Sequence, residues 1–341
     1  MKRTPEPIYL ILGPTGVGKS DFALSLADTV DGEIINCDVG QFYVPLTIGT
    51  AKPAWKQEAI PHHLFDILTE PCDYTVAAYR QAVTQKIEEI RGRGKTPLIV
   101  GGSLFYAQAL FFPPTHKAPA DGSAPVSDNF YTNPAFALLS TQELWDQLLA
   151  IDPERARVLH PHDRYRIERA LNLWESTGVL PSSCKPVYDP VFDHWTVLYL
   201  TRERAELYDR INARTRIMIE QQAWKEEVAS LAPSWHPFVR KKGLIGYGEI
   251  LDALAQGTPD EELIATIQQE TRRYAKRQET FWRSMARKLS VTDAHGITVS
   301  QIPTDTDNTA DTNNIINVNL TFLDVDLYIK QLQAQLLRSN T

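Results

Sequence analysis

The residues with the clearest chemical meaning form a glycine-rich segment near the N-terminus. Gly13-Pro-Thr-Gly-Val-Gly-Lys-Ser20 fits the pattern G-x-x-x-x-G-K-[ST], the P-loop, at every fixed position. Its glycines let backbone N–H groups turn toward a phosphate chain, and the following helix directs its positive end at the same anion. The expected phosphate-binding residues are Gly13, Pro14, Thr15, Gly16, Val17, Gly18, Lys19 and Ser20.

Two of these side chains have distinct tasks in such a loop. Lys19 is placed to reach the terminal phosphate, and the Ser20 hydroxyl is a ligand for Mg²⁺. Most P-loops bind a nucleotide such as ATP and serve hydrolases or kinases, so the motif by itself predicts a bound diphosphate or triphosphate without naming a reaction.

A carboxylate follows the next apolar run of the chain. Residues 33–37 read as a buried strand that ends directly before Asp38. Ligands of α/β proteins bind at the carboxyl ends of parallel strands. There Asp38 can hold Mg²⁺ through water, accept a proton from a nucleophile, or cap a turn, and its position leaves all three open.

Both motifs need a parallel sheet to hold them. Apolar runs predict buried strands, and three- and four-residue spacing of apolar side chains predicts helices. Because the two alternate, we expect an α/β protein with flanking helices. The expected strands are 8–12, 33–37, 97–100 and 197–200, and the expected helices are 20–27, 74–91, 141–150, 202–232 and 260–288.

Composition changes along the chain predict its organisation. Residues 112–135 are rich in proline and predict an exposed connection, Asp152-Pro153 predicts a helix start, and 304–317 read as a disordered linker before a terminal amphipathic helix. We expect a catalytic core of residues 1–111 and 190–290, a mainly helical insertion of 112–189, and a partly disordered acidic tail of 291–341.

The overall composition favours a globular cytoplasmic protein. No apolar stretch is long enough to span a membrane, and the three cysteines are scattered, which argues against a disulfide framework or a zinc site. The formal net charge of −7 is unevenly distributed. From 290 onward six Asp face only Lys330 and Arg338, whereas residues 201–288 carry sixteen Lys or Arg against thirteen acids. The acidic total therefore does not exclude a nucleic-acid partner.

Further motifs follow the P-loop in order. They are IGTAKP at 48–53, HHLFD at 62–66, VGGSLFY at 100–106, HPHD at 160–163, RINAR at 210–214, IGY at 245–247 and TRRYAKRQ at 271–278. With the P-loop, this series resembles the tRNA dimethylallyltransferases, also called tRNA isopentenyltransferases, over residues 8–288. The resemblance implies a P-loop NTPase-like fold with a smaller insertion that clasps tRNA.

The resemblance also implies a reaction. A dimethylallyl group leaves dimethylallyl diphosphate and joins the exocyclic N6 of the adenine that follows the anticodon in tRNA. The P-loop then holds the diphosphate of the prenyl donor with Mg²⁺, and Asp38 is the base that takes the amino proton. The implied catalytic residues are Asp38, Arg214, Lys19, Thr15 and Ser103, and Ser20 is the implied metal ligand.

The implied partner is the anticodon stem-loop of tRNA. The adenine must be unstacked from its neighbours in the loop to reach the site. Phe42, Tyr43 and Phe105 are candidates for stacking on it. The residues expected to bind tRNA are Asp38, Val39, Gly40, Gln41, Tyr165, Arg166, Arg169, Gly246, Tyr247, Lys276 and Arg277. We expect a monomer, because one tRNA is an asymmetric partner.

This chain departs from the family pattern at several positions. Val39 replaces the usual Ser, Ser103 replaces Thr, Leu104 replaces Gly, and Val44 stands where Arg or Lys is common. The proline-rich stretch 112–135 does not resemble the charged helical insertion of the family. Three other functions stay open: prenyl transfer to free AMP, ADP or ATP, a small-molecule kinase, and a non-catalytic RNA-binding relative. The basic segments of the second half favour tRNA as the acceptor. A kinase function would not explain the IGTAKP and TRRYAKRQ motifs.

Overall fold

The computed structural model describes residues 8–113, 115–117, 126–127, 133–291, 298–300, 314–321 and 323–339. The chain divides into two compact units. The larger comprises the described parts of Met1–Gln108 and Val191–Thr341, and the smaller those of Ala109–Pro190. The two limits of the smaller unit lie a few residues from those suggested for the insertion, whereas the described residues after 290 belong to the larger unit.

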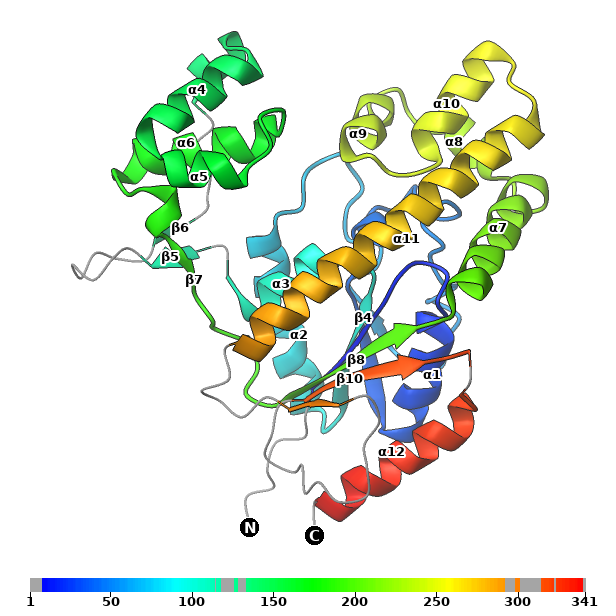
Figure 1. Ribbon diagram of the computed structural model, residues 1–341. Coiled ribbons are helices and arrows are strands. Elements are labelled where there is room, and N and C mark those ends of the chain that lie inside the picture. Colours follow the sequence, from blue (N-terminus) through cyan, green and yellow to red (C-terminus); the bar gives the residue numbers. More distant parts are fainter. Residues whose placement is uncertain are drawn as a thin grey trace. The chain divides into compact units, whose positions relative to one another are not determined.

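A seven-stranded, all-parallel sheet forms the centre of the larger unit, in the order β3-β2-β4-β1-β8-β10-β9 (Figure 1). Strand β1 pairs with β4 and β8, and all five of its side chains are buried, as expected for an apolar run covered on both faces. The strands are β1 (Ile8–Leu12), β2 (Gly32–Asn36), β3 (His62–His63), β4 (Thr96–Gly101), β8 (Trp195–Thr201), β9 (Thr298–Ser300) and β10 (Asn314–Asn319).

Helices surround this sheet. The described helices of the larger unit are α1 (Lys19–Thr29), the 3₁₀ turn η1 (Val39–Phe42), α2 (Val76–Gly92), α3 (Leu104–Phe111, which runs into the smaller unit), α7 (Arg204–Glu220), α8 (Trp224–Ala229), α9 (Trp235–Lys242), α10 (Tyr247–Gln256), α11 (Asp260–Val291) and α12 (Val325–Ser339). The P-loop joins β1 to α1, and α11 packs on α7. The alternation of strands and helices confirms the predicted α/β class.

The C-terminal segment differs from the separate acidic tail that the sequence suggested. Asn314–Asn319, expected partly within a disordered linker, is strand β10 and pairs with β8. Ile315, Ile316 and Val318 are buried there, so a short apolar pattern outweighed the polar composition around it. Helix α12 packs beside α1 (Figure 1). The ring centroids of Phe22 and Tyr328 lie 6.4 Å apart at this contact.

A second difference concerns the helix expected over 202–232. It is divided into α7 and α8, and Ala223 between them has a φ of 56°. A residue in this left-handed conformation ends the regular hydrogen bonding of a helix. The first residue of α8, the buried Trp224, packs against the backbone at Gly49 and Gly246.

The smaller unit has a helical core and a small antiparallel sheet. Its elements are β5 (Thr115–Lys117), β6 (Val126–Ser127), η2 (Pro134–Leu138), α4 (Thr141–Ile151), α5 (Pro153–Val158), α6 (Arg164–Thr177), η3 (Pro181–Ser183) and β7 (Lys185–Pro186). Asp152 caps α5 by accepting a hydrogen bond from the Arg155 N–H, with Pro153 at the first position, as predicted. Of the proline-rich stretch, residues 114, 118–125 and 128–132 lie outside the described residues.

None of the described helices combines the length and the apolarity that a crossing of the bilayer requires.

Candidate active site

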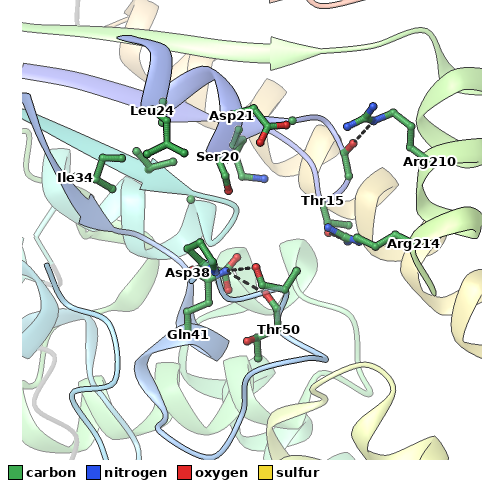
Figure 2. Close-up of a pocket in the computed structure, with 18 of the residues that line it drawn as sticks. Thr15, Ser20, Asp21, Leu24, Ile34, Asp38, Gln41, Thr50, Arg210 and Arg214 are labelled. Carbon is green, nitrogen blue, oxygen red and sulfur yellow. Dashed lines mark hydrogen bonds between the residues drawn. The ribbon is translucent and has the colours of Figure 1, made fainter. Parts of the chain in front are cut away.

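A pocket of about 510 Å³ lies beside the P-loop in the larger unit. Its walls come from the P-loop and α1, the segment after β2, the end of β4, and α7. Figure 2 shows Arg210 and Arg214 approaching it from α7, and Asp38 and Gln41 near Thr50. The structure therefore brings the predicted phosphate cradle and the predicted base to one cavity.

The P-loop is shaped by its own backbone and held by basic side chains. Gly18 has a φ of 106° and precedes the first residue of α1, a turn that side-chain-bearing residues rarely adopt. The Lys19 ammonium donates to the carbonyls of Gly13 and Pro14, each at 3.0 Å. Arg202 donates to the Val17 carbonyl at 2.8 Å and Arg210 to the Gly16 carbonyl at 2.9 Å, so α7 and the residues before it anchor the loop.

Arg214 is a second cation of the pocket besides Lys19, and Thr15 is its hydrogen-bond partner. The Arg214 guanidinium donates to the Thr15 hydroxyl at 2.6 Å across 199 residues of sequence. Burial lowers the pKa of Arg214 and the Asp38 carboxylate raises it, but an arginine remains charged in either case. Lys19 and Arg214 thus give the cradle two positive charges for an anion.

Asp38 stands where β2 ends. Its N–H donates to the Asn36 side chain at 2.9 Å, and its carboxylate accepts from the Gly40 N–H at 3.3 Å. It therefore caps η1 and also lines the pocket, so the capping role does not exclude a chemical one. Burial raises the pKa of the Asp38 carboxyl, although the Lys19 ammonium opposes this shift.

Gly102 lies between the carboxylate of Asp38 and the ammonium of Lys19. A Cβ on Gly102 would lie 3.5 Å from both Asp38 Oδ2 and Lys19 Nζ. The same space is thus bordered by a proton acceptor and a cation. Burial lowers the pKa of Lys19 to about 8, with Asp38 raising it and Arg214 lowering it. This arrangement can bind an anionic leaving group while a carboxylate accepts a proton nearby.

Ser103 connects to the Asp38 side of the pocket. Its hydroxyl accepts a hydrogen bond from the Val39 N–H at 3.0 Å, and its own N–H donates to the Cys37 carbonyl at 3.1 Å. In this structure Ser103 holds the backbone around Asp38. This hydrogen bond joins Ser103 and Val39, which are two of the positions where the chain departs from the family pattern.

Sequence comparison gives the family of this chain. The family model described as IPP transferase matches residues 41–285, and that described as isopentenyl transferase matches residues 6–60. The chain belongs to the IPP transferase family. It is 36% identical to tRNA dimethylallyltransferase 2 of Geotalea uraniireducens, over 81% of this chain and 88% of that protein. It is 34% identical to tRNA dimethylallyltransferase of Bacillus pumilus, over 86% and 90%.

Solved structures of IPP transferases agree with this assignment. The full-length tRNA isopentenylpyrophosphate transferase of Bacillus halodurans is 29% identical, with a TM-score of 0.59 and coverage of 98% of this chain and 97% of that one. A eukaryotic dimethylallyltransferase, described as acting on tRNA, is 28% identical, with a TM-score of 0.66 and coverage of 80% and 69%. The chain has the P-loop NTPase-like fold of this prenyltransferase family, as predicted.

Several of the motifs that resemble this family make hydrogen bonds and ion pairs within the larger unit. Lys52 of IGTAKP forms a buried ion pair with Asp66 of HHLFD and also donates to the Tyr43 carbonyl. The Gln41 amide donates to the Thr50 carbonyl at 3.1 Å. Gln41, predicted to bind tRNA, is therefore engaged in fixing the loop that follows Asp38.

Tyr247 of the IGY motif is likewise an internal residue of the larger unit. Its ring is 1% exposed, and its hydroxyl donates to Glu227 at 2.7 Å. The other Glu227 oxygen accepts from the N–H groups of Thr47 and Ile48. Gly246 and Tyr247 were predicted to bind tRNA, and here their segment is joined to the IGTAKP loop through Glu227.

Two of the three aromatic candidates for base stacking lie in the hydrophobic core. Phe42 and Tyr43 are both 0% exposed. Phe42 packs against Tyr74, Tyr79 and Tyr106, and Tyr43 against Trp235 and Phe238. In this conformation neither ring offers a face to a nucleobase, whereas Phe105 is 47% exposed.

The basic candidates fall in both units. Lys276 and Arg277 are exposed on α11, where the Arg277 guanidinium lies 5.7 Å from the centre of the Tyr274 ring. In the smaller unit, α6 carries Tyr165, Arg166 and Arg169. Tyr165 is 66% exposed, and Arg166 pairs with Asp163 at 2.7 Å. Their binding of tRNA stays a prediction.

Two further side chains of the TRRYAKRQ segment, Tyr274 and Gln278, were not predicted as site residues from the sequence. Burial raises the pKa of Tyr274 and the Asp38 carboxylate raises it further, whereas a hydrogen bond with Gln278 opposes the shift. Gln278 is 5% exposed and contacts the P-loop. The motif itself was the available signal, but its spacing does not say which residues face inward.

Proposed function

We propose that this protein transfers a dimethylallyl group from dimethylallyl diphosphate to N6 of the adenine on the 3′ side of the anticodon in tRNA, acting as a cytoplasmic monomer. The observation that carries the proposal is that Asp38 Oδ2 and Lys19 Nζ border the same space beside Gly102. A prenyl transfer to an amine needs this pair of groups. The relatives' names supply the acceptor.

The cationic side of the pocket suits the leaving group. As the C1–O bond of the donor breaks, its electron pair passes to the diphosphate, while positive charge develops on the allylic carbon. Lys19, Arg214 and the N–H groups of the P-loop stabilise the growing negative charge, because they are held in place before the reaction begins. The Thr15 hydroxyl orients Arg214.

The carboxylate side suits the nucleophile. The adenine amino group is a weak nucleophile because its lone pair is delocalised into the ring. As N6 forms its bond to C1, Asp38 accepts the proton that N6 releases. The raised pKa of Asp38 makes it a stronger base than an exposed aspartate. The capping hydrogen bond from Gly40 fixes its orientation.

The donor set fits Mg²⁺ held mainly by substrate. Within the described part of the chain, no group of three or more His, Cys, Asp or Glu side chains forms a metal cage. Mg²⁺ commonly keeps several waters and binds through one or two protein oxygens plus substrate phosphates. The exposed Ser20 at the start of α1 lines the pocket and can supply one of them. When bound, the ion neutralises diphosphate charge.

A direct assay tests the proposal. The full chain is incubated with labelled dimethylallyl diphosphate and Mg²⁺, with unmodified tRNA, AMP or no acceptor, while ATP turnover is followed separately. We expect label in tRNA at the adenine next to the anticodon. Label in AMP alone would identify a free-nucleotide transferase. ATP turnover without prenyl transfer would indicate a kinase or hydrolase.

The pH dependence provides a further prediction. The free enzyme is active with Asp38 ionised and Lys19 protonated. Because the pKa of Lys19 is about 8, we expect kcat/KM for the prenyl donor to fall as pH rises through 8. It should also fall at acid pH through the raised pKa of Asp38. A Lys19→Arg variant that retains activity should lose the alkaline decline, because its guanidinium stays charged. An alkaline limb unchanged in that variant would assign it to another group.

A further inference from the structure

Gln278 joins the two halves of the pocket from a helix distant in sequence. It lies on α11 and is 5% exposed. Its carboxamide oxygen accepts a hydrogen bond from the Thr15 N–H at 2.9 Å, and its nitrogen donates to the Gly102 carbonyl at 2.8 Å. One planar group therefore spans the P-loop and the loop after β4.

These two bonds complete a continuous series of contacts. Thr15 accepts from Arg214 through its hydroxyl, and Gly102 is followed by Ser103, whose hydroxyl accepts from the Val39 N–H. The series connects the cations on one side with the neighbour of Asp38 on the other. In order, its members are Arg214, Thr15, Gln278, Gly102, Ser103 and Val39.

The packing around Gly102 indicates that this spacing is tight. A Cβ there would lie only 2.6 Å from the Gln278 nitrogen. A side chain at position 102 would therefore collide with the Gln278 carboxamide, and glycine leaves room for it. Leu12 of β1 and Gly101 of β4 are the last paired residues of these two strands, and beyond them the Gln278 carboxamide bridges the two loops.

We propose that Gln278 is a positioning residue that sets the distance and orientation of Asp38 relative to the P-loop. This inference rests on the proposed function for the reaction concerned, and Gln278 is not among the residues that line the pocket. The physical reason is alignment. Transfer requires N6, C1 and the departing oxygen to be in line, and a misplacement of about 1 Å can cost on the order of 10²-fold in rate.

The principal experiment compares Gln278→Met with Gln268→Met in the full chain. Methionine is similar to glutamine in length and helix propensity, so α11 is preserved. Gln268 is a matched control because it lies on the same helix and donates one hydrogen bond, to the Asn212 carbonyl at 3.0 Å. We expect kcat with tRNA to fall about 10- to 100-fold in Gln278→Met. KM for the donor should change less than about threefold, because the other P-loop N–H groups remain.

A conservative variant tests the bridge itself. In Gln278→Glu, the carboxylate can accept from Thr15 but has no proton for the Gly102 carbonyl. The protonated acid regains that donor. We therefore expect the kcat of Gln278→Glu, divided by that of Gln278→Met at the same pH, to rise as pH falls. A side chain that only supports folding would alter melting temperature without this change in ratio.

Hydrogen exchange gives a readout that needs no reaction. Exchange of the Thr15 and Val39 N–H groups should accelerate at least about 10-fold in Gln278→Met and stay at the wild-type rate in Gln268→Met. Wild-type kcat in a folded Gln278→Met, or an equal loss in Gln268→Met, would overturn the inference. A wild-type protein that prenylates neither tRNA nor AMP would refute the proposed function instead, and the exchange rates would then decide the positioning role.

Discussion

Replacing Asp38 by asparagine is expected to lower kcat for prenyl transfer by about 10²- to 10⁴-fold, the range typical of a lost general base. Asparagine keeps the oxygen that accepts the Gly40 N–H and is itself a good capping residue, so η1 should persist. The variant loses only the ability to take the proton from N6. KM for the prenyl donor should change little, because Lys19 and Arg214 remain.

The stability of this variant separates a chemical role from a structural one. The raised pKa of Asp38 means that the folded state binds this proton more tightly than the unfolded chain does. The ionised form therefore costs stability at neutral pH, and a neutral isostere should keep or raise the melting temperature. At pH values where both states are protonated, the difference should vanish.

Asp324→Asn is the matched control for Asp38→Asn. Asp324 also accepts a backbone N–H, that of Leu327, but it is exposed at the start of α12. Its substitution should leave kcat within about twofold of wild type, as is usual for surface positions. If Asp38→Asn retains more than about a tenth of the wild-type kcat, a group other than Asp38 takes the proton.

Replacing Lys19 by methionine is expected to lower kcat by about 10²- to 10³-fold, comparable to removing one preorganised donor from a developing anion. The donor's KM should rise as well, since the ammonium attracts the diphosphate before the reaction. The loss should be largest below about pH 8, where Lys19 is charged in the free enzyme. Single-turnover measurements with bound donor separate the two effects.

The control for Lys19→Met is Lys86→Met. Lys86 lies on α2 and pairs with Glu89 at 2.6 Å, an interaction on the surface of the helix. This substitution should leave both kcat and KM unchanged within about twofold. Equal activity of Lys19→Met and wild type below pH 8 would mean that Lys19 does not stabilise the leaving group.

The local sequence correctly predicted those elements whose signature residues lie within a few positions of one another. The P-loop was predicted because its glycines, lysine and serine are adjacent, and the structure forms the strand–loop–helix that the pattern requires. Asp38 was predicted at the end of a strand for the same reason, and β2 ends two residues before it. The helix starting at Pro153 is confirmed with its aspartate cap.

The local sequence misjudged features that depend on distant partners. Phe42 and Tyr43 were candidates for base stacking, but rings from α2, α3 and α9 cover them in the core. The linker expected before the C-terminal helix includes β10, because β8 offered an edge for Ile315 and Ile316 to join. A polar composition cannot reveal such an edge.

The sequence by itself determined that a P-loop is followed by a strand-end carboxylate, because each signal lies within a few consecutive residues. Only the tertiary structure decided how far apart these groups stand and what holds them there. Gln278 meets Thr15 across 263 residues, and Arg214 meets it across 199. Such pairings arise from the packing of α7 and α11 in the larger unit. Residue spacing along the chain carries no record of that packing.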